Sequence, residues 1–261
     1  MYDENEYHNR IKALNIRHYS GEVPYYTKAP IRKVENKLLG FLEKRSKILD
    51  LGCGSGRFSI GAAQLKLDVT GLDITPEAIK AAEGRAKSLK LSNVHFILGD
   101  MTQIPFSDNV FDYVFCPRFS VNAVATFKKR QAAFSEMIRV VKPGGTVYVE
   151  SFNKFYLGKG LYSPIRNILI DACRIINIFL HRMINKEYLG LLPGDIVYES
   201  NKTEGASVGY AHLSTVSELL ASLPKNIIHN FYSSPQILGK RIDLFKYFRY
   251  SLWVFIVKKQ D

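Results

Sequence analysis

Short apolar segments alternate with helical segments between residues 47 and 151, the predicted core, and this alternation restricts the fold more than any other feature. Five segments have the pattern of strands, from KILDLG at residues 47–52 to TVYVES at residues 146–151. Between the second and third, Thr75 and Pro76 form a helix start that opens EAIKAAEGRAKSLK. Strands joined by helices of this length need crossover connections, which produce a parallel sheet. The pattern therefore predicts an α/β protein whose ligand binds at the carboxyl ends of the strands.

The composition favours a globular, reduced protein in the cytoplasm. Of 261 residues, 46% are hydrophobic, which is enough for a sizeable core. Cys53, Cys116 and Cys173 lie far apart and form no CxxC pair, so neither a disulfide framework nor a metal site is expected. The first residues are polar and acidic, unlike a signal peptide. Because no apolar run reaches about 18 residues, we expect no membrane insertion.

We interpret both flanks of the core as parts of one domain that spans residues 1–261. The first flank, residues 1–46, is predicted to be an N-terminal helical arm that acts as a lid. Its sequence indicates a helix, a turn between Gly21 and Pro24, and a second helix that Pro30 opens.

The second flank begins with residues 152–207, which break the alternation and are predicted to be a mainly helical lid insertion after the fifth strand. Within it, residues 163–186 carry apolar side chains at helical spacing. This amphipathic helix is expected to cover the core or a substrate cleft, with a membrane-surface or dimer role as the alternative. Residues 208–261 are expected to complete the sheet, because two strand patterns follow a capping box formed by Thr215 and Glu218.

The first strand runs directly into a loop with glycines on alternate positions, ILDLGCGSGRF at residues 48–58. Gly52, Gly54 and Gly56 allow a sharp turn and a close approach of ligand to the backbone, and a helix N-terminus follows with free N–H groups. No lysine stands where a phosphate-binding P-loop requires one. In a dinucleotide fingerprint a glycine would stand where Arg57 does, so a ligand with a nucleoside but no pyrophosphate fits better.

Acidic residues follow the next two strands. Asp73 ends VTGLD about 20 residues beyond Gly52, where a carboxylate accepts hydrogen bonds from both ribose hydroxyls. Asp100 and Met101 follow the third strand, where an aspartate can accept from an adenine amino group while an apolar neighbour packs on the ring. Each feature alone also fits a turn or a helix cap. Together, at three successive strand ends, they predict a nucleoside site.

Four motifs in normal order closely resemble those of the class I S-adenosylmethionine-dependent methyltransferases. They are ILDLGCGSGRF, VTGLDITPEAIKAA, VHFILGDMTQIPFSDNVFDYVFC and IRVVKPGGTVYVES. The resemblance covers residues 47–151 and leaves the arm and the insertion outside. It implies a Rossmann-like, seven-stranded, mostly parallel sheet with an antiparallel last hairpin, into which SLWVFIVKK fits.

The resemblance implies S-adenosylmethionine as cofactor and assigns roles by position. The glycine loop would lie against the methionine portion, Asp50 near its ammonium group, Asp73 at the ribose and Asp100 at the adenine amino group. Ile74 and Met101 would pack on the adenine ring. The implied cofactor-binding residues are Asp50, Gly52, Cys53, Gly54, Gly56, Asp73, Ile74, Asp100, Met101 and Pro117, with Cys53 as a small packing residue.

A small molecule is the leading prediction for the methyl acceptor, because MTQIPFSDNVFD is the form common in the branch that modifies quinones and natural products. Families that methylate exocyclic base amines carry an Asp/Asn-Pro-Pro-Tyr run where this chain has CPRFS. Tyr25, Tyr26, Arg118 and Asn122 are the candidates for the substrate pocket. The net charge of +12 prompts a transfer-RNA methyltransferase as the alternative. A non-catalytic protein that binds the cofactor is a third possibility.

His212 is the candidate catalytic base. It precedes a capped helix, whose positive N-terminal end disfavours the imidazolium and keeps the ring able to accept a proton. A structural role in packing is the alternative for this residue. His18 in the arm could also reach the acceptor. The sequence indicates nothing about the oligomeric state.

Overall fold

The structure is a computed structural model, and it describes residues 4–154, 194–200, 207–225, 227–244 and 246–260. In chain order its elements are α1 (Glu4–Thr27), α2 (Lys33–Leu39), β1 (Lys47–Leu51), α3 (Arg57–Gln64), β2 (Asp68–Asp73), α4 (Pro76–Ser88), β3 (Val94–Leu98), β4 (Phe111–Cys116), η1 (Ser120–Ala123), α5 (Phe127–Val140), β5 (Val141–Phe152), β6 (Asp195–Ser200), β7 (Ser207–His212), α7 (Val216–Ser222), β8 (Ile227–Tyr232), α8 (Ser234–Ile237), η3 (Lys246–Phe248) and β9 (Ser251–Lys258).

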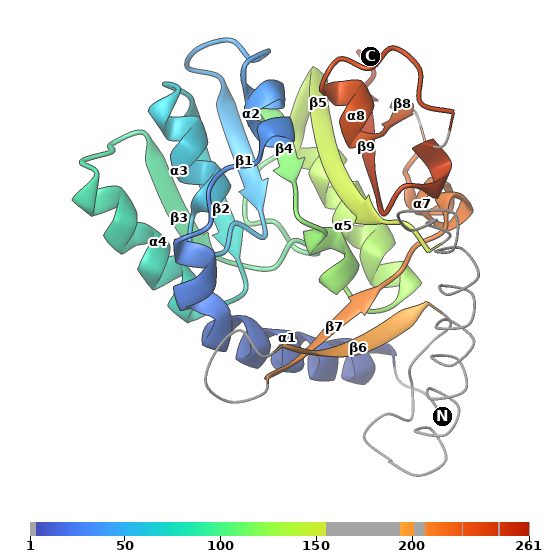
Figure 1. Cartoon of the computed structure of the whole chain (residues 1–261), viewed down its shortest axis with the longest axis horizontal. Helices are drawn as coiled ribbons and strands as arrows, with labels where there is room; N and C mark the ends of the chain where they lie inside the picture. Colours follow the sequence, from blue (N-terminus) through green and yellow to red (C-terminus); the bar gives the residue numbers. More distant parts are fainter. Residues whose placement is uncertain (1–3, 155–193, 201–206, 226, 245, 261) are drawn as a thin grey trace.

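Seven strands form the central sheet in the order β3-β2-β1-β4-β5-β9-β8 (Figure 1). The first five are parallel, whereas β9 runs antiparallel to β5 and β8 antiparallel to β9. The order reverses between β1 and β4, so the ligand crevice is expected at their carboxyl ends. This arrangement confirms the predicted fold class.

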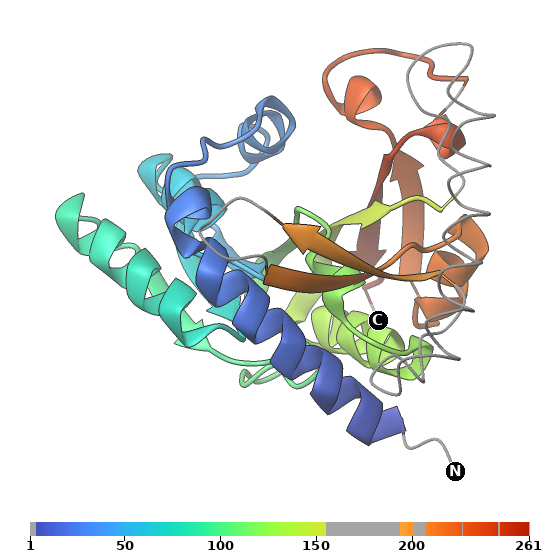
Figure 2. The same cartoon turned by 60° about the horizontal axis from the view of Figure 1, so that its bottom comes forward.

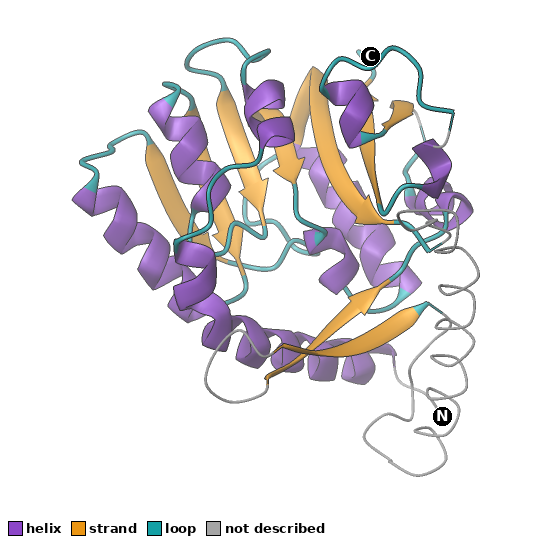
Figure 3. Cartoon of the chain, in the orientation of Figure 1, coloured by secondary structure: helices purple, strands orange, loops and turns teal. Residues whose placement is uncertain are grey.

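Helices cover both faces of the sheet because its strands are apolar on both sides (Figure 3). On one face, Leu49 and Val114 pack with Phe134 of α5 and Leu219 of α7. On the other, Ile48 of β1 and Phe115 of β4 pack with α2, α3 and α8, in a cluster that contains Trp253. Successive residues of β1 are therefore fully buried in opposite layers.

The arm and a β6–β7 hairpin lie across the carboxyl ends of the parallel strands (Figure 2). Buried polar contacts fasten α1 to the hairpin: Asn15 Oδ1 accepts from the Tyr210 backbone N–H at 2.9 Å, and the Tyr7 hydroxyl donates to Asp195 Oδ2 at 2.9 Å. Asn15 Nδ2 also donates to the Ala123 carbonyl at 3.1 Å. The arm thus roofs the sheet edge where a ligand site is expected.

The arm differs from its prediction because α1 runs unbroken through Gly21 and Pro24. Pro24 lies in the last turn of the helix, so its missing N–H removes only one main-chain bond near the end. Tertiary packing outweighs the local turn signal, since His18 and Glu22 on either side of Gly21 are buried.

The insertion also differs in its described part. Within it, Asp195–Ser200 form strand β6, which pairs with β7, and neither strand joins the main sheet. The predicted boundary at residue 208 therefore falls inside a hairpin. The predicted helix at residues 163–186 lies outside the described residues, as does Cys173. Within the described residues, no helix is both long enough and apolar enough to cross a bilayer.

Candidate functional site

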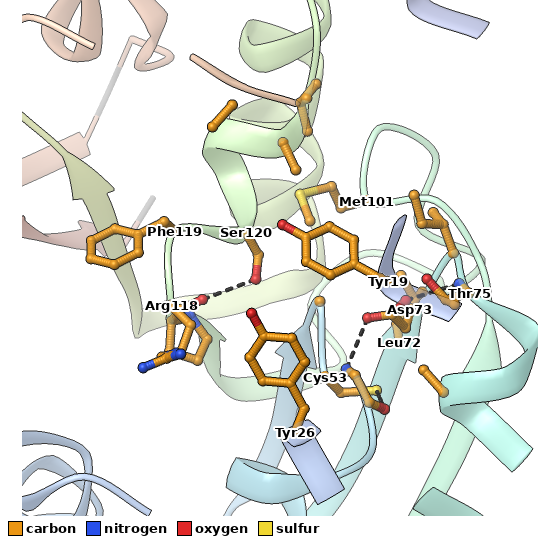
Figure 4. Close-up of a pocket in the computed structure, with 18 of the residues that line it drawn as sticks. Tyr19, Tyr26, Cys53, Leu72, Asp73, Thr75, Met101, Arg118, Phe119 and Ser120 are labelled. Carbon is orange, nitrogen blue, oxygen red and sulfur yellow. Dashed lines mark hydrogen bonds between the residues drawn. The ribbon is translucent and has the colours of Figure 1, made fainter. Parts of the chain in front are cut away.

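A cavity of about 600 Å³ lies between the strand ends, α1 and the β6–β7 hairpin (Figure 4). Its floor comes from the loops that follow β1, β2, β3 and β4, and its walls include Tyr19 and Tyr26 of α1 together with Tyr198 of β6. The cavity has two chemically different ends. One contains the carboxylates at the strand ends, and the other is aromatic.

The glycine loop holds its shape through left-handed backbone and close contact. Gly52 has φ +70° and Gly54 φ +52°, which L side chains rarely adopt. A Cβ on Gly52 would stand 2.3 Å from Ser120 Oγ, so this position admits only glycine without a shift of the η1 start. A Cβ on Gly54 would meet no protein atom within 4 Å. Because Gly54 lines the cavity, its backbone is open to a ligand.

Asp73 is held in place by two backbone donors. Its Oδ2 accepts from Gly54 N at 2.8 Å, and its Oδ1 accepts from Thr75 N at 2.9 Å. Burial raises the pKa of Asp73, although these hydrogen bonds oppose the shift. Each oxygen keeps acceptor capacity toward the cavity, as a ribose diol requires.

Asp50 is fully buried below the glycine loop and also lines the cavity. Its Oδ2 accepts from Ser59 Oγ at 2.5 Å, while its Oδ1 has no hydrogen-bond partner among the described residues. Burial raises the pKa of Asp50 to about 7, with the Ser59 hydrogen bond and the Arg57 charge opposing the shift. A buried acceptor without a donor fits a cationic ligand group such as the methionine ammonium.

Asp100 receives donors from two distant parts of the chain. Thr102 N and Oγ1 each donate to Asp100 Oδ1 at 2.8 Å, and Lys12 Nζ of α1 donates to Oδ2 at 2.7 Å. His8 Nε2 lies 4.0 Å from the same Oδ2. Burial alone would raise the pKa of Asp100, but these partners lower it well below its usual range. The carboxylate is thus ionised and can accept from an adenine amino group.

The other end of the cavity is built of aromatic rings. Phe119 and Phe152 stack with centroids 3.7 Å apart and planes 13° apart. Tyr250 meets both edge-on, at 5.6 Å and 5.1 Å. The Arg118 guanidinium carbon lies 6.0 Å from the Tyr26 ring centroid. Planar apolar groups are therefore favoured at this end.

A buried ionic cluster fixes the loops that separate the two ends. Glu35 of α2 accepts hydrogen bonds from both Arg32 and Arg57. Burial alone would raise the pKa of Glu35, but the two arginines outweigh this effect and lower it. Glu150 of β5 accepts from Arg32 Nη1 at 2.9 Å and from the Arg118 backbone N–H at 2.9 Å. Arg57, which stands where a dinucleotide-binding motif would have a glycine, thus belongs to this ionic cluster through its hydrogen bond to Glu35.

Most of the sequence-predicted site residues meet in this cavity. Its lining includes Asp50, Gly52, Cys53, Gly54, Asp73, Ile74, Asp100, Met101, Pro117, Tyr26 and Arg118. Gly56 lies behind the loop, where a Cβ would approach Phe96, Ala82 and Ile60. Tyr25 points to solvent with 47% of its surface exposed, so its placement in the substrate pocket is corrected.

The structure also corrects the placement of His212 and Asn122. His212 is buried and does not line the cavity; its Nδ1 lies 2.7 Å from Asp195 Oδ1, and Glu218 approaches Nε2 to 3.5 Å. Asn122 Nδ2 donates to the His212 carbonyl at 2.5 Å, and Asn122 Oδ1 accepts from Phe152 N at 3.1 Å. Both side chains join the hairpin to the core because β7 turns away from the cavity before it reaches His212. His18 is buried beside Glu22 and Tyr198, also outside the lining.

Sequence reasoning missed the residues that reach the site from distant segments. His8 and Lys12 reach Asp100 from α1, while Tyr198 and Tyr210 come from the hairpin. Local patterns contain no sign of these contacts. Phe119 directly follows Arg118, a predicted pocket residue, so its position in the sequence was a signal that it lies near the site. Its left-handed φ of +65° is visible only in the structure.

The fold and the nucleoside-sized site together define a class I S-adenosylmethionine-dependent methyltransferase. A family model described as a methyltransferase domain matches residues 42–188, more than half of the chain. The chain belongs to this methyltransferase domain family, and S-adenosylmethionine is its cofactor.

Individual relatives agree with this assignment. The demethylmenaquinone methyltransferase of a Geobacillus species is 37% identical over 109 residues, which cover 41% of this chain and 45% of that protein. The norajmaline N-methyltransferase of Rauvolfia serpentina is 31% identical over 112 residues, 42% of this chain and 37% of that protein. The chain therefore matches less than half the length of either relative.

A solved structure shares the fold over most of the chain. The crystal structure of a methyltransferase described as SAM-dependent, from Methanosarcina mazei, aligns with a TM-score of 0.62 at 22% identity. The alignment covers 89% of this chain and all of that protein.

Proposed function

We propose that the protein transfers a methyl group from S-adenosylmethionine to a small-molecule acceptor. The supporting observation is a roofed cavity with two ends, one suited to a nucleoside and an amino acid, the other to an apolar acceptor. Its volume of about 600 Å³ lies within the range of pockets that enclose small ligands.

The strand-end residues hold the cofactor in this proposal. Asp73 accepts both ribose hydroxyls, Asp100 accepts the adenine amino group, and Ile74 and Met101 cover the ring. Asp50 Oδ1 accepts from the methionine ammonium. Pro117, which precedes the turn that carries Arg118, faces the reacting carbon.

When bound, S-adenosylmethionine supplies a methyl carbon that its sulfonium has already activated. The protein's contribution is to orient the acceptor for in-line attack, which can be worth about 7–11 kcal/mol. The roof formed by α1 and the hairpin excludes water from the reacting centre. These contributions need no base among the residues that line the cavity.

The roof also bears on the choice of acceptor. A nucleic-acid acceptor would have to insert its base past Tyr19 and Tyr26, which line the cavity from α1. A small molecule can be enclosed completely, so the roof does not have to leave an opening for the rest of a polymer chain. Two relatives are named for small-molecule acceptors, a demethylmenaquinone methyltransferase and a norajmaline N-methyltransferase. Their names agree with a small-molecule acceptor for this protein.

Formation of S-adenosylhomocysteine tests the proposal directly. The protein is incubated with methyl-labelled S-adenosylmethionine and either a nuclease-treated small-molecule extract or purified transfer RNA. We expect label to enter the small-molecule fraction only. Label in the RNA would contradict the small-molecule assignment, and cofactor binding without any turnover would favour a non-catalytic protein.

Cofactor affinity is expected to rise with pH between about 6 and 7. The buried Asp50 has its pKa raised to about 7, and the ligand ammonium favours the ionised form, so binding below this pH must release a proton. We expect the affinity for S-adenosylhomocysteine to increase up to about tenfold per pH unit in this window and to level off above pH 7. Isothermal calorimetry in two buffers of different ionisation enthalpy measures the proton release.

Asp50→Asn is the control for this pH dependence. The amide keeps the shape of Asp50 but cannot ionise, so the slope below pH 7 should disappear. Burial also raises the pKa of Asp73, and Asp73→Asn measures how much of the slope that carboxyl contributes. A slope that persists in Asp50→Asn at full size would remove Asp50 from the ammonium site.

A further inference from the structure

We propose that the acceptor is a planar aromatic anion, whose ring packs against Phe119 and Phe152 and whose negative charge pairs with Arg118. This inference rests on the proposed methyltransferase function and names the substrate class of the same site. Three independent features of the aromatic end of the cavity support it. They are its aromatic surface, the Arg118 guanidinium, and the location of the lining carboxylates and imidazole at the opposite end of the cavity.

The aromatic surface is rigid and flat. Phe119 and Phe152 are stacked at 3.7 Å, and Tyr250 closes the corner edge-on. All three line the cavity. Stacked and edge-on rings favour a further planar ring over a flexible alkyl chain, because aromatic partners adopt offset or perpendicular geometries with a defined face.

The turn that presents Phe119 is strained, which indicates that its geometry serves the site. Arg118 has φ +55° and Phe119 φ +65°, conformations that cost energy for residues other than glycine. Glu150 Oε2 holds the turn by accepting from Arg118 N, and Ser120 Oγ holds it by donating to the Pro117 carbonyl at 2.9 Å. The two consecutive left-handed residues place Arg118 and Phe119 side by side on the cavity wall.

The charge at this end is positive. Within the described part of the chain, the Arg118 guanidinium has no salt bridge to a carboxylate, and its contact is with the Tyr26 ring. Glu150 cannot neutralise it from below, because both Glu150 oxygens already accept from the Arg32 guanidinium. Arg118 is an exposed residue that lines the cavity beside the aromatic rings, and its planar guanidinium can bind an anionic ligand there with two hydrogen bonds.

Among the described residues, no carboxylate or imidazole lies at this end of the cavity. The carboxylates and the imidazole that line the cavity are Asp50, Asp73, Asp100 and His8, and His8 stands beside Asp100 at the adenine end. The hydroxyls of Tyr19 and Tyr198 have pKa values raised by burial, so neither is available as a phenolate.

An acceptor that is already an anion needs no base. Its anionic atom forms the new bond to the methyl carbon as the carbon–sulfur bond breaks, and that electron pair returns to sulfur. The acceptor group begins negative and ends neutral, while the sulfonium becomes a neutral thioether. No proton is transferred, which agrees with the lack of a carboxylate or imidazole among the described residues at this end.

Three probes with the same ring test the proposal: 2-naphthoate, its neutral amide 2-naphthamide, and the cationic 2-naphthylmethylamine. Their binding is measured by fluorescence with S-adenosylhomocysteine-loaded protein. We expect 2-naphthoate to bind about tenfold more tightly than the amide, and the amine to bind most weakly. Arg118→Gln should abolish the difference between naphthoate and amide, while Phe152→Leu should weaken both to a similar extent.

Arg241→Gln, which removes an exposed arginine outside the cavity lining, is the matched control and should leave the preference intact. The proposal is overturned if the amide or the amine binds as tightly as naphthoate, if naphthoate does not bind, or if Arg118→Gln keeps the preference. Failure of the unmodified protein to bind S-adenosylhomocysteine would instead contradict the proposed function itself.

Discussion

Asp73→Asn should weaken S-adenosylhomocysteine binding by at least about 2 kcal/mol, or about thirtyfold, because the two charge-assisted hydrogen bonds that we propose between Asp73 and the ribose would lose their charged acceptor. The substitution keeps the size of the side chain. It also disturbs one of the two backbone bonds that Asp73 accepts, from Gly54 N or Thr75 N. Calorimetric titration gives the affinity, and a urea titration gives the change in unfolding free energy separately.

Asp68→Asn is the control, because Asp68 stands exposed at the opposite end of the same strand β2. It should leave the affinity unchanged. An Asp73→Asn protein with the affinity of the parent would show that the ribose is bound elsewhere. Binding of NAD more tightly than S-adenosylhomocysteine by the parent protein would contradict the cofactor assignment.

Gly52→Ala should lower both the stability and the cofactor affinity. The new Cβ would lie 2.3 Å from Ser120 Oγ and 2.5 Å from Ser120 Cβ, at a backbone φ of +70°. Overpacking and the left-handed conformation together should cost about 2–5 kcal/mol of unfolding free energy. Because Ser120 follows the Arg118–Phe119 turn, its displacement should also distort the cavity. Urea unfolding and cofactor titration measure the two effects.

The double variant Gly52→Ala with Ser120→Gly separates the clash from the backbone strain. It removes both close atoms of Ser120, so part of the lost stability should return. Gly84→Ala is a second control: this glycine lies exposed within α4 and an added Cβ meets nothing within 4 Å, so alanine should stabilise the protein by up to about 1 kcal/mol. No recovery in the double variant would argue against the clash.

The cavity residues at the strand ends could be predicted from the sequence, because each of them belongs to a short segment that ends or follows a strand. Asp50 lies near the end of β1, Asp73 ends β2 and Asp100 follows β3. The apolar residues identify these strands, and parallel strands bring their carboxyl ends to one edge. Gly52 and Gly54 have the left-handed backbone for which glycine is the best residue. Local sequence and the parallel rule were sufficient for these positions.

The acceptor half could not be predicted in the same way. His212 has the helix-cap neighbours that were predicted, since Thr215 Oγ1 accepts from Glu218 N at 3.1 Å, but its ring turns to Asp195 in the hairpin. Pairing of β6 with β7 had no local signal. The partners of Asp195 come from Tyr7 in the arm and Tyr210 in β7, and only their burial together decides where each side chain points.

The sequence by itself determined the parallel core, the glycine loop and the order of the aspartates at the strand ends, because hydrophobic period, turn chemistry and strand-end position are properties of short segments. Only the tertiary structure decided that α1 continues through Pro24, that Lys12 reaches Asp100, and that Arg118 and Phe119 line the aromatic end of the cavity. Those arrangements depend on contacts between residues far apart in the chain. The free energy that stabilises these arrangements comes from the burial of side chains and from polar contacts between distant segments, which no single segment can provide.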